Sequence, residues 1–131
     1  MKGYTMLRIE LINNIEARRK KLNITIENLS TLSNLGVRTV NRLLAGDDVK
    51  LSTVEQVTNL LGLDFAGNEV MTFKELEKRR AKEKAIFMVA LVQGTSSLEM
   101  QGLEKESINH MLKKMEREFL VGSYRNRLWV A

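Results

Sequence analysis

The chain has 131 residues, of which 44% are hydrophobic and 28% charged, and its formal net charge is +5. This size and composition suit one folded domain with an appendage and exclude disorder along the whole chain. Because there is no cysteine and only one histidine, the sequence also excludes disulfide bonds, thiolate zinc sites and a pair of histidine metal ligands.

The residue usage favours helices. There is no proline, and the frequent residues Leu, Ile, Met, Lys and Glu lose little side-chain freedom in a helix. The longest apolar run, Ala85–Val92, is too short to cross a membrane, and the first residues lack the apolar stretch of a secretory signal. We therefore expect an all-α protein of the cytoplasm, which the absence of cysteine also suits.

The positive net charge favours a polyanionic partner, most often nucleic acid. The charge is spread out, because residues 1–65 hold nine Lys and Arg against seven Asp and Glu, and residues 66–131 hold twelve against nine. Five basic residues of the second half could either contact phosphates or solvate a surface, and we favour solvation. They are Lys78, Arg79, Lys82, Arg125 and Arg127.

Four helices are predicted in the first half of the chain from apolar residues at helical spacing and from residues that favour helix ends. They are Leu7–Leu22, Ile26–Leu32, Val37–Ala45 and a fourth helix that Ser52 or Thr53 caps and that ends near Leu61. Thr25 suits the N-cap of the second helix. Gly46 suits the left-handed backbone that often ends a helix, here the third.

The helix predicted over Val37–Ala45 has two unlike faces. Its apolar face consists of Val40, Leu43 and Leu44, and the opposite face of Arg38, Asn41, Arg42 and Ala45, with Val37 at the border. A helix fits the DNA major groove, where arginine can bind guanine and asparagine can bind adenine through two hydrogen bonds. Together with the preceding short helix and the Ser-Asn-Leu-Gly turn, this pattern predicts a helix-turn-helix.

The segment Ser33–Gly46 resembles the helix-turn-helix of the Cro/repressor (XRE-type) regulators, whose pattern is roughly S-G-V-S-x-x-T-I-x-R-I-E-x-G. Leu51–Val54 and Leu60–Leu63 resemble the fourth helix of that family, and the resemblance covers about Leu7–Phe65. It implies a lambda-repressor-like, five-helix-type domain. It also implies DNA contacts by Val37, Arg38, Asn41 and Arg42, with Thr25 close to the DNA backbone. We further expect Lys50 to contact DNA.

The chain departs from the family pattern in and around the two helices. Ile26 replaces a frequent phosphate-binding Gln, Gly36 a capping Ser or Thr, and Leu44 a Glu that often pairs with an arginine at the position of Arg19. Asp47 and Asp48 add negative charge to a loop that usually lies near phosphates. We expect these changes to weaken DNA binding by a single copy without disturbing the core.

The boundary between two domains is predicted within Leu63–Met71, where Gly67 and Asn68 indicate a turn and a very short strand or hairpin is compatible with the pattern. Residues 1–66 would be the DNA-binding domain, and residues 67–131 a C-terminal, hairpin-like helical extension. In that extension the sequence predicts a helix over Phe73–Gln93 that Thr72 caps, one turn at Leu98–Gln101 and a last helix over Glu104–Val121.

The segment Ala85–Val92 is apolar on all sides and is therefore predicted to be buried on every side. The last helix offers one apolar stripe, formed by Ile108, Met111, Leu112, Met115, Phe119 and Leu120. We favour a second copy of the chain over the first domain as the cover of the other side. The expected dimerisation residues are Ile86, Met88, Val89, Val92, Met115 and Phe119, and Trp129 is expected to anchor an interface or the core.

These features predict a sequence-specific transcriptional regulator, a homodimeric repressor that inserts Val37–Ala45 into the major groove of double-stranded DNA. The alternative is an antitoxin-like module that masks a toxin through the C-terminal half and that also binds its operator. No cofactor or metal is predicted. Catalysis is not predicted either, because His110 has no nucleophile near it in the sequence and no carboxylate pair or phosphate-binding loop stands out.

Overall fold

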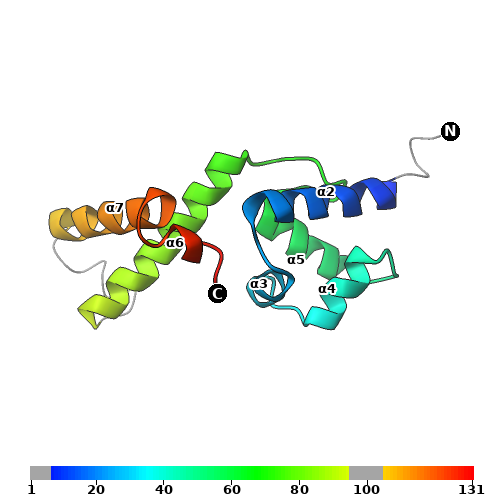
Figure 1. The fold of residues 1–131 in the computed structure, drawn as a ribbon, viewed down its shortest axis with the longest axis horizontal. Helices are drawn as coiled ribbons and strands as arrows, with labels where there is room; N and C mark the ends of the chain where they lie inside the picture. Colours follow the sequence, from blue (N-terminus) through cyan, green and yellow to red (C-terminus); the bar gives the residue numbers. More distant parts are fainter. Residues whose placement is uncertain (1–6, 95–104) are drawn as a thin grey trace. The chain divides into compact units, whose positions relative to one another are not determined.

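The computed structural model describes residues 7–94 and 105–131, and its regular elements over these residues are helices (Figure 1). They are α2 (Leu7–Leu22), α3 (Ile26–Leu32), α4 (Val37–Leu44), α5 (Leu51–Leu61), α6 (Phe73–Gln93), α7 (Lys105–Val121) and the short 3-10 helix η2 (Arg125–Arg127). The predicted all-α fold is thereby confirmed. None of these helices is long and apolar enough to span a membrane.

The described chain forms two compact units, one ending at Phe73 and the other spanning Lys74–Val130. In the first unit, α2 packs against α4 and α5, and α3 packs against α4. Its core includes five side chains that are 0% exposed, namely Ile15, Leu29, Val40, Val57 and Leu61. Each such burial contributes about 1.5–3 kcal/mol relative to exposure, so the apolar faces of the four helices hold the unit together.

The ends of the helices in the first unit follow local chemistry. Thr25 is the N-cap of α3, as predicted, and its hydroxyl accepts a hydrogen bond from Asn28 N at 3.1 Å. Gly46, with a φ of 85°, has the left-handed backbone predicted for it after α4. The predicted cap of α5 is wrong: the helix begins at Leu51, because Lys50 already has the extended backbone of a cap and accepts a hydrogen bond from Thr53 N at 3.0 Å.

The segment after α5 folds back onto the first unit. An isolated antiparallel bridge joins Leu63 to Glu69, and the turn between them includes Gly67 at a φ of 85°. A Cβ atom on Gly67 would lie 3.0 Å from the Asn14 side chain, so a larger residue would clash there. Because this segment packs on α2, the first unit extends past residue 66 as far as Phe73.

The second unit is built by α6, α7 and the C-terminal turn. Val89, Ala90 and Ile108 form a buried cluster, against which α7 packs the partly buried Met111, Leu112 and Met115. Near the other end, Arg80 donates hydrogen bonds to the carbonyls of Leu128 at 2.9 Å and Val130 at 3.0 Å. Trp129 is buried beside Arg80 and serves the core of this unit. The predicted turn at Leu98–Gln101 lies outside the described residues.

Burial on every side of Ala85–Val92 is not what the described chain shows. Ala85, Val89 and Ala90 are buried, but Phe87 is 61%, Leu91 60% and Val92 73% exposed. The physical reason is that α7 supplies one apolar stripe and covers one side of α6 only. Val89 and Phe119, which we expected at a dimer interface, lie inside the unit's own core at 3% exposure each.

Candidate nucleic-acid interface

The turn between α3 and α4 is held by hydrogen bonds within the chain. Ser33 N donates to Leu29 O at 2.9 Å and Leu35 N donates to Ser30 O at 2.9 Å, while the Ser30 hydroxyl donates to Leu35 O. Asn34 has a left-handed φ of 58°, a conformation that asparagine tolerates better than most residues. The two helices are thus fixed relative to each other without a side-chain cap at Gly36, the N-cap of α4.

The two predicted faces of α4 are present in the structure. Val40 and Leu43 are buried at 0% and 3% exposure and lock the helix onto the unit. On the other side, Val37, Arg38, Asn41 and Arg42 are all exposed. The helix therefore presents two guanidinium groups and one amide on a rigid apolar support.

Two further predicted contact residues flank α4. Thr25 is exposed at the start of α3, where its hydroxyl is engaged in the cap. Lys50 is exposed at the start of α5. Together with the exposed side of α4, the predicted DNA-contacting residues thus lie on three consecutive elements of one unit.

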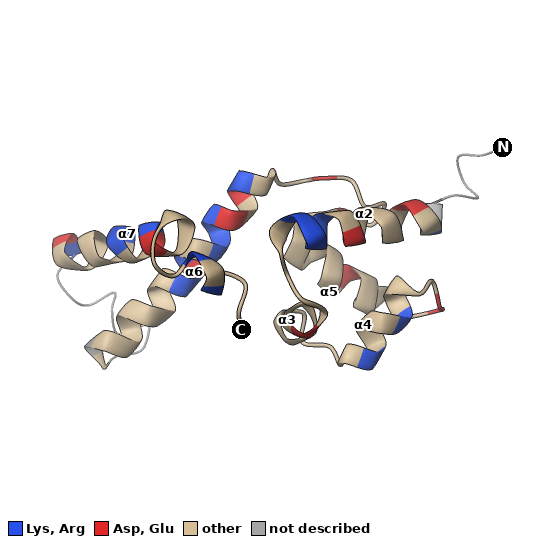
Figure 2. Ribbon diagram, in the orientation of Figure 1, with Lys and Arg blue, Asp and Glu red and all other residues tan. Residues whose placement is uncertain are grey.

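The acidic loop after α4, which contains Asp47 and Asp48, contacts Arg42 directly. The Arg42 guanidinium donates a hydrogen bond to the Asp48 carbonyl at 3.2 Å, and its Nε lies 3.8 Å from Asp47 Oδ2. From α2, Arg8 Nη2 lies 2.7 Å from Asp48 Oδ1. Figure 2 shows the basic residues of α4 beside the acidic loop. Sequence reasoning missed this arrangement, since Arg8 and Asp48 are forty positions apart and no local pattern links them.

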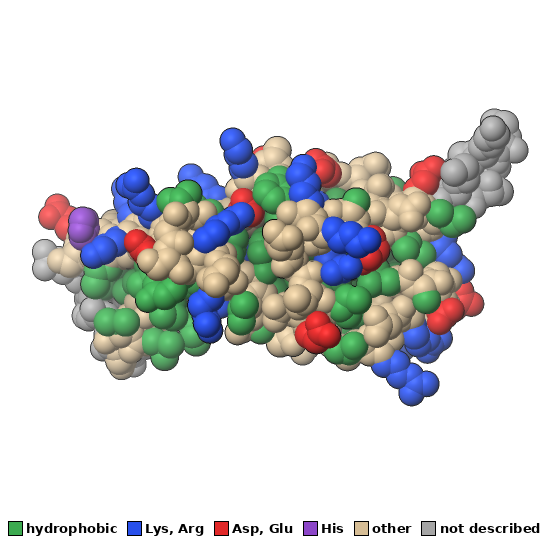
Figure 3. All heavy atoms as spheres, in the orientation of Figure 1, with side chains coloured by type: hydrophobic (Ala, Val, Ile, Leu, Met, Phe, Trp, Pro, Cys, Tyr) green, Lys and Arg blue, Asp and Glu red, His purple; other side chains and the backbone are tan. Residues whose placement is uncertain are grey.

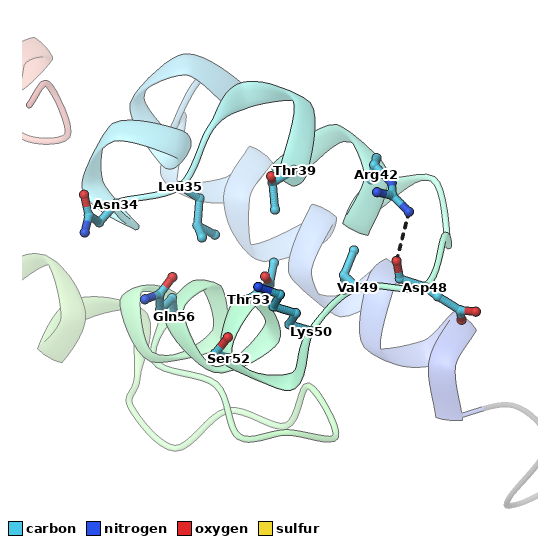
Figure 4. A pocket seen from close by; sticks show the side chains of 10 residues that line it. All are labelled: Asn34, Leu35, Thr39, Arg42, Asp48, Val49, Lys50, Ser52, Thr53 and Gln56. Atoms are coloured by element: carbon cyan, nitrogen blue, oxygen red, sulfur yellow. Dashed lines mark hydrogen bonds between the residues drawn. The ribbon is translucent and has the colours of Figure 1, made fainter.

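An open hollow of about 640 Å³ lies between α4 and α5 (Figure 4). Thr39 and Arg42 line it from α4, and the side chains of Ser52, Thr53 and Gln56 from α5, with Lys50 between them. Asn34 closes the end near the α3–α4 turn. Asp48 also lines the hollow, so its hydroxyl, amide and charged groups suit a polar partner. The sequence analysis did not predict Asn34, Ser52 and Gln56 as contact residues. In the described part of the chain, no group of three or more His, Cys, Asp or Glu side chains could hold a metal ion.

Arg19 finds a partner other than the one usual in the resembled family. With Leu44 in place of a glutamate, its Nε lies 2.6 Å from Glu16 Oε1 on the same helix, and Nη1 donates to Ile24 O at 2.9 Å. The hydrogen bond from Arg19 lowers the pKa of the Glu16 carboxyl and in turn raises the pKa of Arg19. Arg19 therefore braces the end of α2 through its own helix.

The first unit as a whole carries little net charge. Residues 7–73 contain eight Lys and Arg and eight Asp and Glu, whereas residues 74–130 contain twelve and eight. Non-specific attraction to DNA phosphates depends on the number of cations that neutralise them. The first unit therefore combines the exposed predicted contact residues of α4 with little net charge for long-range attraction to DNA.

The order α3, short turn, α4 and the packing of the two helices on each other are those of a helix-turn-helix. A family model described as helix-turn-helix matches residues 15–68 of the chain, a range that contains α3, α4, α5 and the second half of α2. The match confirms, over residues 15–68, the resemblance to the Cro/repressor (XRE-type) helix-turn-helix, and domains of this type serve DNA-binding regulation. Neither a comparison with curated proteins nor one with solved structures finds a match.

Proposed function

We propose that this protein is a homodimeric repressor that binds a specific DNA sequence in the cytoplasm by inserting α4 into the major groove. The observation that supports this most strongly is the exposed side of α4. Arg38 and Asn41 are exposed there on a helix whose other side is locked by Val40 and Leu43. Such side chains can read base edges, because the helix cannot rotate away from the groove.

The contact residues have distinct proposed roles. Arg38 and Asn41 read base edges, and Val37 supplies an apolar surface that suits a thymine methyl group. Arg42, which the acidic loop holds, contacts either a base edge or a phosphate. Thr25 and Lys50 lie beside the DNA backbone, where contacts fix the register without specifying sequence.

A single neutral unit with one recognition helix offers few contacts, which is the reason for proposing a dimer. Two copies would address two half-sites about one helical turn apart. The surface proposed for dimerisation is the apolar patch of α6, which consists of the exposed residues Ile86, Phe87, Leu91 and Val92. Figure 3 shows hydrophobic side chains gathered over the second half of α6. Met88 and Met115, both half-buried, would line its margin.

The same apolar patch would serve the alternative function, in which the C-terminal half masks a toxin. Exposed apolar side chains on a helix suit a second copy or a different protein equally well. The two functions differ in stoichiometry: the dimer predicts self-association of the pure protein, whereas the antitoxin-like module needs its partner for that surface to be covered.

The function is tested by selecting bound duplexes from a random-sequence library with the purified full chain at near-physiological salt. We expect enrichment of a short palindromic motif. The control is Arg38→Ala combined with Asn41→Ala, which should bind the library without enriching that motif. Enrichment of no motif by the wild-type protein would rule out sequence-specific regulation.

A further inference from the structure

The first half of α6 has a row of lysines along one side. Lys74, Lys78 and Lys82 follow each other at four-residue spacing, which places them on one face of the helix, about 6 Å apart along its axis. All three are exposed. We call these residues the lysine stripe. Figure 2 shows basic residues along this part of α6.

The acidic residues of α6 are engaged elsewhere. Glu77 is nearly buried and lies 2.5 Å from Arg125 Nη2. Glu83 lies 3.6 Å from Arg80 and 4.0 Å from Arg79. Glu75 sits in the first turn, where a carboxylate interacts favourably with the helix dipole.

These pairings compensate the arginines of α6 but not its lysine stripe. Over residues 7–94 and 105–131, none of the ion pairs involves Lys74, Lys78 or Lys82. The stripe is therefore a run of three solvent-facing positive charges with no ion-pair partner among the described residues.

The distribution of charge favours nucleic acid as the partner of this stripe. The helix-turn-helix unit is neutral over residues 7–73, and the surplus of cations belongs to residues 74–130. Double-stranded DNA carries a negative charge every 1.7 Å or so along its axis, and each cation that neutralises a phosphate releases counterions. The stripe begins at Lys74, the first residue after the helix-turn-helix unit ends.

In place of the solvated surface expected from the sequence for Lys78 and Lys82, we propose that the lysine stripe of α6 is a second DNA-contacting surface, which binds phosphates of the duplex that the helix-turn-helix unit reads. This inference rests on the proposed function and deepens it. The helix-turn-helix supplies sequence preference, and the lysine stripe supplies most of the non-specific attraction. Flexible lysine stems suit this task, because phosphate contacts need charge and reach rather than a fixed geometry.

The test compares two triple variants of the full chain that lose the same charge. One is Lys74→Gln, Lys78→Gln and Lys82→Gln, and the control is Lys105→Gln, Lys113→Gln and Lys114→Gln on α7, where all three lysines are also exposed. Affinity for a mixed-sequence duplex and for the selected motif is measured over a range of salt concentrations. Each phosphate contact contributes about 0.9 to the slope of log affinity against log salt.

We expect the stripe variant to lose about 2 to 3 from that slope on both duplexes, with an unchanged ratio of specific to non-specific affinity, and the α7 control to lose little. An unchanged slope, or an equal loss in both variants, would overturn the proposal. Binding to vesicles of anionic phospholipid is measured for the same variants. If the stripe variant loses vesicle binding while its slope on DNA is unchanged, the proposal is also overturned, since the stripe would then serve a lipid surface.

The same measurements separate this proposal from the proposed function. If the wild-type protein prefers no sequence but the stripe variant still loses slope, specific regulation fails and the lysine stripe stands. If the wild-type protein prefers a motif but the slope of the stripe variant is unchanged, specific regulation stands and the lysine-stripe proposal fails. No binding of any duplex at low salt would overturn both.

Discussion

Arg38 and Arg42 occupy the same exposed side of α4 but differ in their surroundings. Arg42 donates a hydrogen bond to the Asp48 carbonyl and lies near the Asp47 carboxylate. No ion pair among the described residues involves Arg38, so its guanidinium is available to bind a base edge through two hydrogen bonds. At the scale of the residue, Arg38 is therefore the stronger candidate for direct readout, and Arg42 is held by its own domain.

Replacing Arg38 by alanine should weaken binding to the selected motif by about 1–3 kcal/mol, because a two-point contact with a base is lost. Arg42→Ala should cost less than Arg38→Ala, since Arg42 exchanges intramolecular contacts for those with DNA. Titration of labelled duplexes measures both. Lys113→Ala on α7 controls for the lost charge. An equal loss on motif and mixed-sequence DNA would show that Arg38 contacts phosphate instead.

Neutralising the acidic loop by Asp47→Asn with Asp48→Asn should have opposite effects on two quantities. Affinity for mixed-sequence DNA should rise several-fold, because two negative charges near the DNA-facing surface are removed. The ratio of specific to non-specific affinity should fall, because Arg42 loses its ion pair with Asp47 and keeps only the hydrogen bond to the Asp48 backbone carbonyl. Glu106→Gln with Glu116→Gln changes the net charge equally on α7. A higher ratio in the loop variant would contradict a positioning role for this loop.

At the scale of the element, a buried arginine joins α2 to the end of the first unit. Arg18 is 3% exposed, and its guanidinium donates to the carbonyls of Leu61, at 3.1 Å, and of Met71. Its Nη1 lies 2.7 Å from Glu69 Oε1. One side chain thus satisfies the last carbonyl of α5 and fixes the segment that leads into α6.

Arg18→Met should destabilise the first unit by about 2–4 kcal/mol, because two carbonyls and a carboxylate lose a charged donor while the apolar stem is kept. Denaturant unfolding monitored by circular dichroism measures the change. Lys20→Met is the matched control, since Lys20 is exposed and its ion pair with Glu16 spans 3.9 Å, which is worth less than about 1 kcal/mol. Equal stability of the two variants would exclude a structural role for Arg18.

At the scale of the whole molecule, the two units divide their properties unequally. The first is neutral and presents the proposed recognition helix α4, whereas the second has the surplus of positive charge and exposes Phe87, Leu91 and Val92 on α6. Exposed apolar residues of this size, clustered along one helix, are typical of an interface. We therefore expect the second unit to mediate self-association.

Phe87→Glu with Leu91→Glu should convert the proposed dimer into a monomer, because two carboxylates would be buried without partners. Light scattering coupled to size exclusion measures the mass of the wild type and of the variant. Val121→Glu tests the same chemistry at an apolar residue of α7 that is 74% exposed and outside the apolar patch. A monomeric wild type, or a dimer that survives the double substitution, would refute this interface.

The sequence by itself determined the helices and the polarity of their faces. The bounds of α2, α3 and α6 follow from periodicity, and Thr25 and Gly46 act as the local rules require, because these signals depend on residues within a turn or two of each other. The exposed side of α4, with Arg38 and Asn41, follows from the same spacing. The family resemblance adds a function to that pattern, since the matched residues 15–68 include it.

Only the tertiary structure decided which helix faces pack against each other and which stay exposed. Val89 and Phe119 belong to the second unit's own core rather than to an interface, and the exposed patch lies at Phe87 and Leu91 instead. Arg8 meets Asp48 forty positions away, and Arg18 reaches Met71. The physical reason is that helical spacing fixes which side of a helix is apolar or charged, whereas the partner of that side depends on packing between segments distant in the chain.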